Sequence, residues 1–170
     1  MPSKTTSAPS RRAPSTLTAG AVVGKFLAAL LFTGIALALT FPVWLTVNYL
    51  GNPDNGVIVA GYIGSWLMAG GFLAIGSCMS ALTRNQVVAF ILSVVVCFGF
   101  LLSGLPMVTD LFSAWAPQSL LDAIAGFSFL AHFSTISRGV IDLRDLVYFG
   151  LVIGFWLLAN VVVLELRKAD

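Results

Sequence analysis

The sequence predicts an all-helical protein that crosses a membrane four times, with a pair of short amphipathic helices before the last crossing. Hydrophobic residues make up 58% of the 170 residues, charged residues make up 9%, and the mean hydropathy is +0.97. Soluble domains carry about 25% charged residues, so this chain has too few to cover a water-exposed surface. Two further observations support the prediction: the charges separate long uncharged runs, and these runs show no alternation of polar and apolar residues.

Four apolar runs are long enough to cross a bilayer. There are 28 uncharged residues between Lys25 and Asp54, and 29 between Asp54 and Arg84. The next run, up to Asp110, has 25, and a last run has 19. A helix needs about 20 apolar residues to cross a hydrocarbon core of about 30 Å. Strands of a membrane barrel would alternate with period two, so we predict helices. Their expected ranges are Phe26–Leu50, Val57–Leu82, Val87–Leu105 and Leu146–Leu164.

The first two spans contain helix-specific signals. Pro42 lies inside the first span and removes one helical hydrogen bond, which predicts a kink there. The second span contains two pairs of small residues at a spacing of four, Ala60/Gly64 and Gly70/Ala74. Such pairs let another helix approach closely. They are compatible with packing inside one chain and with an interface between subunits.

The segment between the third and fourth spans is too long for a turn and too apolar for a free loop. Pro117 suits the first turn of a helix, and apolar residues then recur at helical spacing in two groups. Gly139 can end the second group. Each group is too short to span, so we predict two amphipathic helices that lie at the outer interface or enter it as a re-entrant hairpin. The two groups are Leu120, Ile124 and Phe127, and Phe129, Phe133 and Ile136.

The basic residues predict the orientation of the spans. With four spans both termini lie on one side, and that side carries seven Lys and Arg residues against two on the other. Basic residues are enriched on the cytoplasmic side, so both termini are expected in the cytoplasm. Residues 1–20 are rich in Ser, Thr, Pro and Ala and predict a disordered cytoplasmic tail, while residues 21–170 form the transmembrane domain. The turn between the second and third spans, Arg84, Asn85 and Gln86, is expected on the cytoplasmic side.

The sequence contains no recognisable catalytic set. His132 is the only histidine, which excludes a metal site of several histidines within one chain, and we interpret it as a polar residue at the membrane interface. The sequence has no P-loop motif for ATP, and no cofactor is expected. The net charge of +2 is too small to indicate nucleic acid as a partner. We therefore predict that the chain is not itself an enzyme and that its constant partner is membrane lipid.

Seven strings of residues, spread over most of the chain, are informative when taken together. The two longest are Leu82–Phe90 and Ser137–Asp145, and the shorter ones are Lys25–Ala28, Leu39–Val43, Tyr49–Asn52, Gly61–Gly64 and Phe72–Gly76. Together they resemble the permease subunits of ABC-2-type transporters, in particular the gliding-motility-type branch. The resemblance runs from about Val22 to Arg167, and the two longest strings are its most specific part.

The resemblance implies a subunit of the bacterial inner membrane that moves a substrate outward. It further implies a separate ABC ATPase subunit that hydrolyses ATP, and a second permease subunit in a homodimer or heterodimer. Short outer helices before the last span are also a feature of that family. Family members usually have six spans, and the four predicted here resemble the last four. The chain is thus expected to be partial relative to the family, as a truncated frame or a split subunit. The turn at Arg84–Gln86 would then face the ATPase.

A second hypothesis belongs to a different class. A small integral membrane scaffold or regulatory protein, with no transport activity, would have the same apolar spans and the same charge distribution. It predicts no associated ATPase and no directional transport in vesicles.

Overall fold

Eight α-helices and no strand make up residues 15–169, the part of the chain that the computed structural model describes. The all-helical prediction is therefore confirmed for this part. Three helical segments are long and apolar enough to cross a membrane. The number rises to five if each of two sharply bent helix pairs is counted as one span. The helices are α1 Ser15–Ala38, α2 Phe41–Leu50, α3 Asn55–Leu82, α4 Gln86–Leu102, α5 Pro106–Ser113, α6 Gln118–Gly126, α7 Phe129–Ser137 and α8 Leu143–Ala169.

The first predicted span consists of α1 and α2, separated by a break at Leu39–Thr40. Pro42 lies in the first turn of α2. Its ring nitrogen cannot donate to the preceding turn, so the helix is interrupted just before it. Across the break, the hydroxyls of Thr40 and Tyr62 lie 2.7 Å apart, and Trp44 Nε1 donates to Asn55 Oδ1 at 2.9 Å. These two contacts connect the broken span to α3.

Helix α1 begins earlier than the sequence predicted. Residues 1–14 of the predicted tail lie outside the described residues, but residues 15–20 form the first turns of α1, so the tail prediction is wrong for them. Thr18 is buried, and its hydroxyl accepts a hydrogen bond from Lys168 Nζ of α8 at 3.0 Å. This contact and the low cost of extending an existing helix explain the longer helix.

Helix α3 lies at the centre of the bundle and packs against α1, α4, α7 and α8. Its small residues allow these close contacts. A Cβ atom at Gly64 would lie 3.0 Å from Ile136 of α7, and one at Gly70 would lie 3.0 Å from Leu30 of α1. Ala60 and Ala74 are buried as well. The small-residue pairs of this span therefore pack inside the chain.

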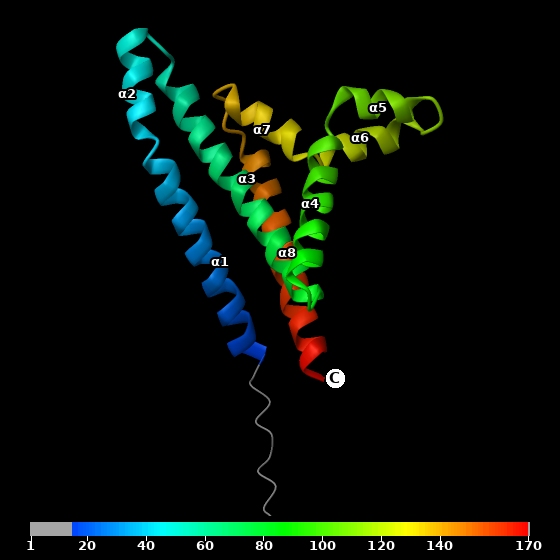
Figure 1. Cartoon of the computed structure of the whole chain (residues 1–170). Coiled ribbons are helices and arrows are strands. Elements are labelled where there is room, and N and C mark those ends of the chain that lie inside the picture. The colour runs from blue at the N-terminus through cyan, green and yellow to red at the C-terminus, as the bar shows by residue number, and fades with distance from the viewer. Residues whose placement is uncertain (1–14, 170) are drawn as a thin grey trace, which may run out of the picture.

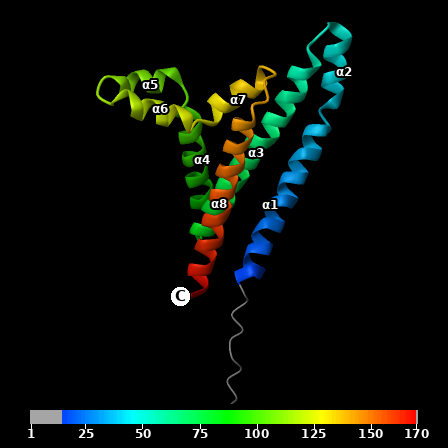
Figure 2. The same ribbon diagram turned by 180° about the vertical axis from the view of Figure 1, so that it is seen from behind.

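The short helices gather at one end of the bundle. Figures 1 and 2 show α5, α6 and α7 at the end opposite to the start of α1 and the end of α8. The chain bends by 78° between α4 and α5, and by 63° between α6 and α7. The start of α1, the α3–α4 turn and the end of α8 lie together at the other end, which we call the terminal end.

The two predicted amphipathic helices occur as α6 and α7, but their environments differ. In α7, Phe129 and Ile136 are completely buried and Phe133 is half-buried. Helix α6 has no buried residue; Leu120 is exposed and Ile124 is half-buried. Because α7 packs against α3, α4 and α8, it belongs to the core of the bundle. The burial of α7 does not fit two helices that both lie on the outer surface, and the bent α6–α7 pair leaves the re-entrant arrangement as a prediction.

Candidate functional site

The turn between α3 and α4 is exposed at the terminal end. Arg84, Asn85 and Gln86 all have exposed side chains. Asn85 caps α4, since its Oδ1 accepts a hydrogen bond from the backbone N–H of Val87 at 3.0 Å. Arg167 of α8 donates to the carbonyl oxygen of Leu82 at 3.0 Å. The turn is thus fixed from both sides, while the guanidinium of Arg84 remains exposed.

Asn85→Ala will lower the free energy of unfolding by about 1 kcal/mol, because the side-chain cap of α4 is lost. The measurement is unfolding in micelles with a denaturing detergent, followed by tryptophan fluorescence. Asn52→Ala, in the exposed α2–α3 loop, is the control and should change stability by less than about 0.5 kcal/mol. Equal losses for the two variants would contradict the capping role.

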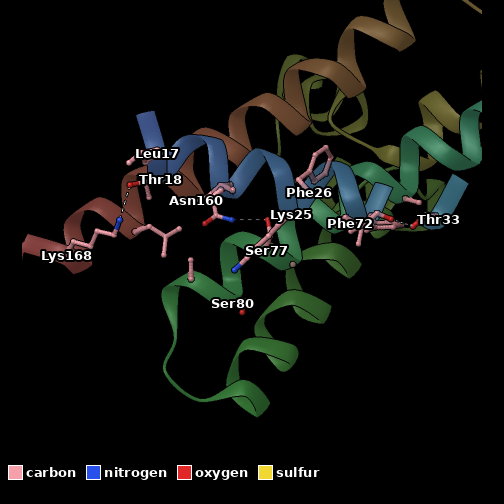
Figure 3. Close-up of a pocket in the computed structure, with 18 residues that line it drawn as sticks. Leu17, Thr18, Lys25, Phe26, Thr33, Phe72, Ser77, Ser80, Asn160 and Lys168 are labelled. Atoms are coloured by element: carbon pink, nitrogen blue, oxygen red, sulfur yellow. Dashed lines mark hydrogen bonds between the residues drawn. The ribbon is translucent and has the colours of Figure 1, made fainter. Parts of the chain in front are cut away.

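A cleft of about 1050 Å³ opens between α1, α3 and α8 near the terminal end. Lys25 from α1, Ser77 and Ser80 from α3, and Asn160 and Lys168 from α8 supply polar side chains to it (Figure 3). Asn160 is buried and donates from Nδ2 to Ser77 Oγ at 3.0 Å. The remaining lining is mainly apolar and includes Phe26, Phe72 and Leu73. The cleft is therefore an apolar space with polar groups on one part of its wall.

A second polar cluster connects α7 to α8 at the other end of the bundle. His132 Nδ1 lies 2.6 Å from Asp145 Oδ1, and His132 Nε2 lies 2.9 Å from the carbonyl oxygen of Gly126. The imidazole stacks on the ring of Tyr148, with centroids 3.9 Å apart. The Tyr148 hydroxyl donates to the carbonyl oxygen of Phe127. The His132 side chain is 16% exposed and that of Asp145 is 7% exposed.

Each of the two hydrogen bonds of the His132 imidazole requires a proton between the ring nitrogen and its oxygen partner. A carbonyl oxygen and a carboxylate both accept, so both imidazole contacts are hydrogen bonds only in two cases. Either His132 is an imidazolium beside an ionised Asp145, or a neutral His132 accepts from a protonated Asp145. Asp145 Oδ2 is buried and has no hydrogen-bond partner among residues 15–169. The cluster holds α7 against the first turn of α8.

The sequence-predicted site residues separate into three places. Arg84, Asn85 and Gln86 lie at the terminal end, as expected for one turn. Phe129, Phe133 and Ile136 lie in the bundle on α7. The others, Leu120 and Ile124 on α6 and Phe127 just after it, lie away from the buried core.

Sequence reasoning missed both polar clusters. It interpreted His132 as a polar residue at the membrane interface and did not connect it with Asp145, whereas the structure pairs these two side chains with each other. No periodicity connects them, since they lie 13 positions apart on different helices. Asn160 was a detectable signal, because it is the only Asn, Gln or charged residue between Leu146 and Leu164. Its partner, Ser77, lies 83 positions away.

Comparison of the chain with protein-family models, with curated proteins and with solved structures finds no match.

Proposed function

We propose that the chain is a permease subunit of an ATP-driven exporter of the ABC-2 type in a bacterial inner membrane. The observation that carries the proposal is the position of the short helices α5, α6 and α7. They lie between α4 and the last long helix, at the end opposite to the α3–α4 turn (Figure 1). Short outer helices before the last span are what the resemblance to ABC-2 permeases implies. The resemblance of the strings Leu82–Phe90 and Ser137–Asp145 adds to this support.

The proposed subunit crosses the membrane four times, through α1 with α2, then α3, α4 and α8. The directions of α3 and α8 support four crossings, because the chain must cross an odd number of times between the end of α3 and the start of α8. Helix α3 ends at the terminal end and α8 begins at the opposite end (Figure 2), so α4 must return the chain across the bundle. Its 17 residues extend about 26 Å, which is close to the hydrocarbon thickness of about 30 Å. Helices α5, α6 and α7 then do not cross.

The proposed orientation places the terminal end in the cytoplasm. Lys25, Arg84, Arg167 and Lys168 lie toward this end, whereas Arg138 and Arg144 flank the loop at the opposite end. Basic residues favour the cytoplasmic side. The exposed turn at Arg84 would then meet an ATPase subunit, which supplies the ATP hydrolysis that this chain does not carry out. A second permease subunit would complete the path for the substrate.

Charge reversal at the proposed ATPase contact tests the proposal. The full chain, tagged and expressed in its own host, is purified in mild detergent, and co-purifying proteins with a P-loop ATPase motif are identified by mass spectrometry. We expect such an ATPase with the unaltered chain and about tenfold less with Arg84→Glu, because a change of about 1.4 kcal/mol in binding alters the equilibrium tenfold. Arg138→Glu, at the opposite end, is the matched control and should retain the ATPase. Absence of any ATPase would contradict the proposal and favour the non-transporting scaffold.

A further inference from the structure

We propose that the cleft between α1, α3 and α8 binds one anionic membrane phospholipid. The proposal rests on the membrane location of the bundle and is independent of export. The cleft follows α1 from Leu17 to Thr33, a distance of about 24 Å along the helix axis. A single molecule that fills the cleft over this length must contact both the polar part and the apolar part of its wall.

The polar and apolar parts are arranged along the cleft in sequence. At the terminal end, Lys168 Nζ donates to Thr18 Oγ1 at 3.0 Å, and Lys25 lines the cleft about two turns further along α1, on the side of Ser77 and Ser80 (Figure 3). Further along α1 the lining includes Phe26 and Ala29, with Phe72 of α3, and one hydroxyl, that of Thr33. A molecule with a charged head and a hydrocarbon tail matches this order, with its head at the terminal end.

The apolar part of the cleft favours a hydrocarbon chain over water. An unfilled space loses dispersion contacts on its walls, and water remains in a cavity only where it finds several polar partners. Acyl chains are the apolar molecules that surround a membrane-embedded bundle. The volume of about 1050 Å³ is at the upper limit of about 300–1,000 Å³ for small-molecule sites, so it has room for acyl chain as well as headgroup.

The charge of the polar part favours an anion. Lys25 and Lys168 line the cleft, and neither forms an ion pair with an acidic side chain among residues 15–169. The aliphatic part of a lysine can lie along an apolar wall while its ammonium group stays at the headgroup level. A phosphate diester at that level would be attracted by the positive charge of both ammonium groups. A zwitterionic lipid would bring its own cation to the same place and would bind less well.

Native mass spectrometry of the full chain tests the proposal with two lipids of equal chain length. The chain is purified in detergent and titrated with phosphatidylglycerol or with phosphatidylcholine. We expect one phosphatidylglycerol per chain and weaker retention of phosphatidylcholine. Lys25→Gln should weaken phosphatidylglycerol binding about fivefold, because one lysine contributes about 1 kcal/mol to binding of an anionic headgroup. Lys25→Arg should restore it. Arg84→Gln, which removes a basic residue outside the cleft, should leave binding unchanged.

A second pair of variants tests the position of the lipid. Gly76 lines the cleft, and a Cβ atom there would meet nothing within 4 Å, so Gly76→Leu fills the cleft without a clash at the backbone. Gly61→Leu is the same change on the same helix, also into open space, but outside the cleft. We expect loss of the bound phosphatidylglycerol in Gly76→Leu only, with unchanged helical circular dichroism in both variants.

Three results would overturn the proposal. Equal retention of the two lipids would exclude the role of the lysines. Equal effects of Gly76→Leu and Gly61→Leu would exclude the cleft. A dimer that dissociates in Gly76→Leu, while lipid binding is unaltered, would show that a second copy of the chain occupies the cleft. None of these results depends on whether an ATPase co-purifies, so failure of the export proposal would be seen separately.

Discussion

Phe129→Ala will lower the free energy of unfolding by about 3 kcal/mol, at the lower end of the range for buried phenylalanines. Phe129 is completely buried. Its ring centroid lies 5.3 Å from that of Phe72, 5.1 Å from that of Phe100 and 5.7 Å from that of Phe149. These rings come from α3, α4 and α8, so one side chain of α7 contacts three other helices. Truncation leaves a cavity where they meet.

We expect a loss at the lower end of the range for buried phenylalanines because the unfolded chain is surrounded by detergent micelles and not by water alone. Much of the ordinary loss comes from transfer of apolar atoms out of water, and this part is smaller when the unfolded chain is already in an apolar environment. The cavity and the lost ring contacts remain. The measurement is unfolding with a denaturing detergent, followed by tryptophan fluorescence.

Phe127→Ala is the matched control for this prediction. The residue lies two positions earlier, and its side chain is 61% exposed. Its carbonyl oxygen, which accepts from Tyr148, is unaffected by the substitution. We expect a loss of less than about 0.5 kcal/mol. If the two alanine variants were equally stable, α7 would not be the core helix that the structure describes.

His132→Phe will also destabilise the protein, by about 3 kcal/mol. Phenylalanine preserves a ring against Tyr148, but both hydrogen bonds of the imidazole are lost. Asp145 then remains as a buried carboxyl group without a partner, because its Oδ2 atom already has none among the described residues. A buried polar group left without its partner costs about 1–3 kcal/mol, and more if the group is charged.

A double-mutant cycle separates the pair from the rest of the packing. In His132→Phe combined with Asp145→Leu, no carboxyl group is left buried and unpaired, so we expect recovery of about 2 kcal/mol relative to His132→Phe alone. The free energies come from the same detergent titration. Additive losses in the double variant would mean that His132 and Asp145 do not interact across α7 and α8.

Local signals in the sequence predicted two of the helix ends. The break before Pro42 follows from the missing N–H of one residue. The caps of α4 and α7 were not predicted, although Asn85 and Ser128 accept hydrogen bonds from the first turns of these helices and such caps depend on residues close in sequence. Gly139 has a φ of 86°, which ends the turn after α7 with a conformation that glycine adopts without strain. The burial of α7 could not be read from its spacing, which is the same whether its apolar face meets lipid or protein.

By itself, the sequence determined an all-helical chain with several runs apolar enough to cross a membrane, and it predicted short helices before the last of these runs. These properties depend on runs of apolar residues and on their immediate neighbours. Only the tertiary structure decided which apolar faces are buried, that His132 meets Asp145, and that α1, α3 and α8 leave a cleft lined by Lys25. Lipid tails and the protein interior are equally apolar, so hydrophobicity cannot tell a core residue from a lipid-facing one. Contacts between positions far apart in the chain have no local signature at all.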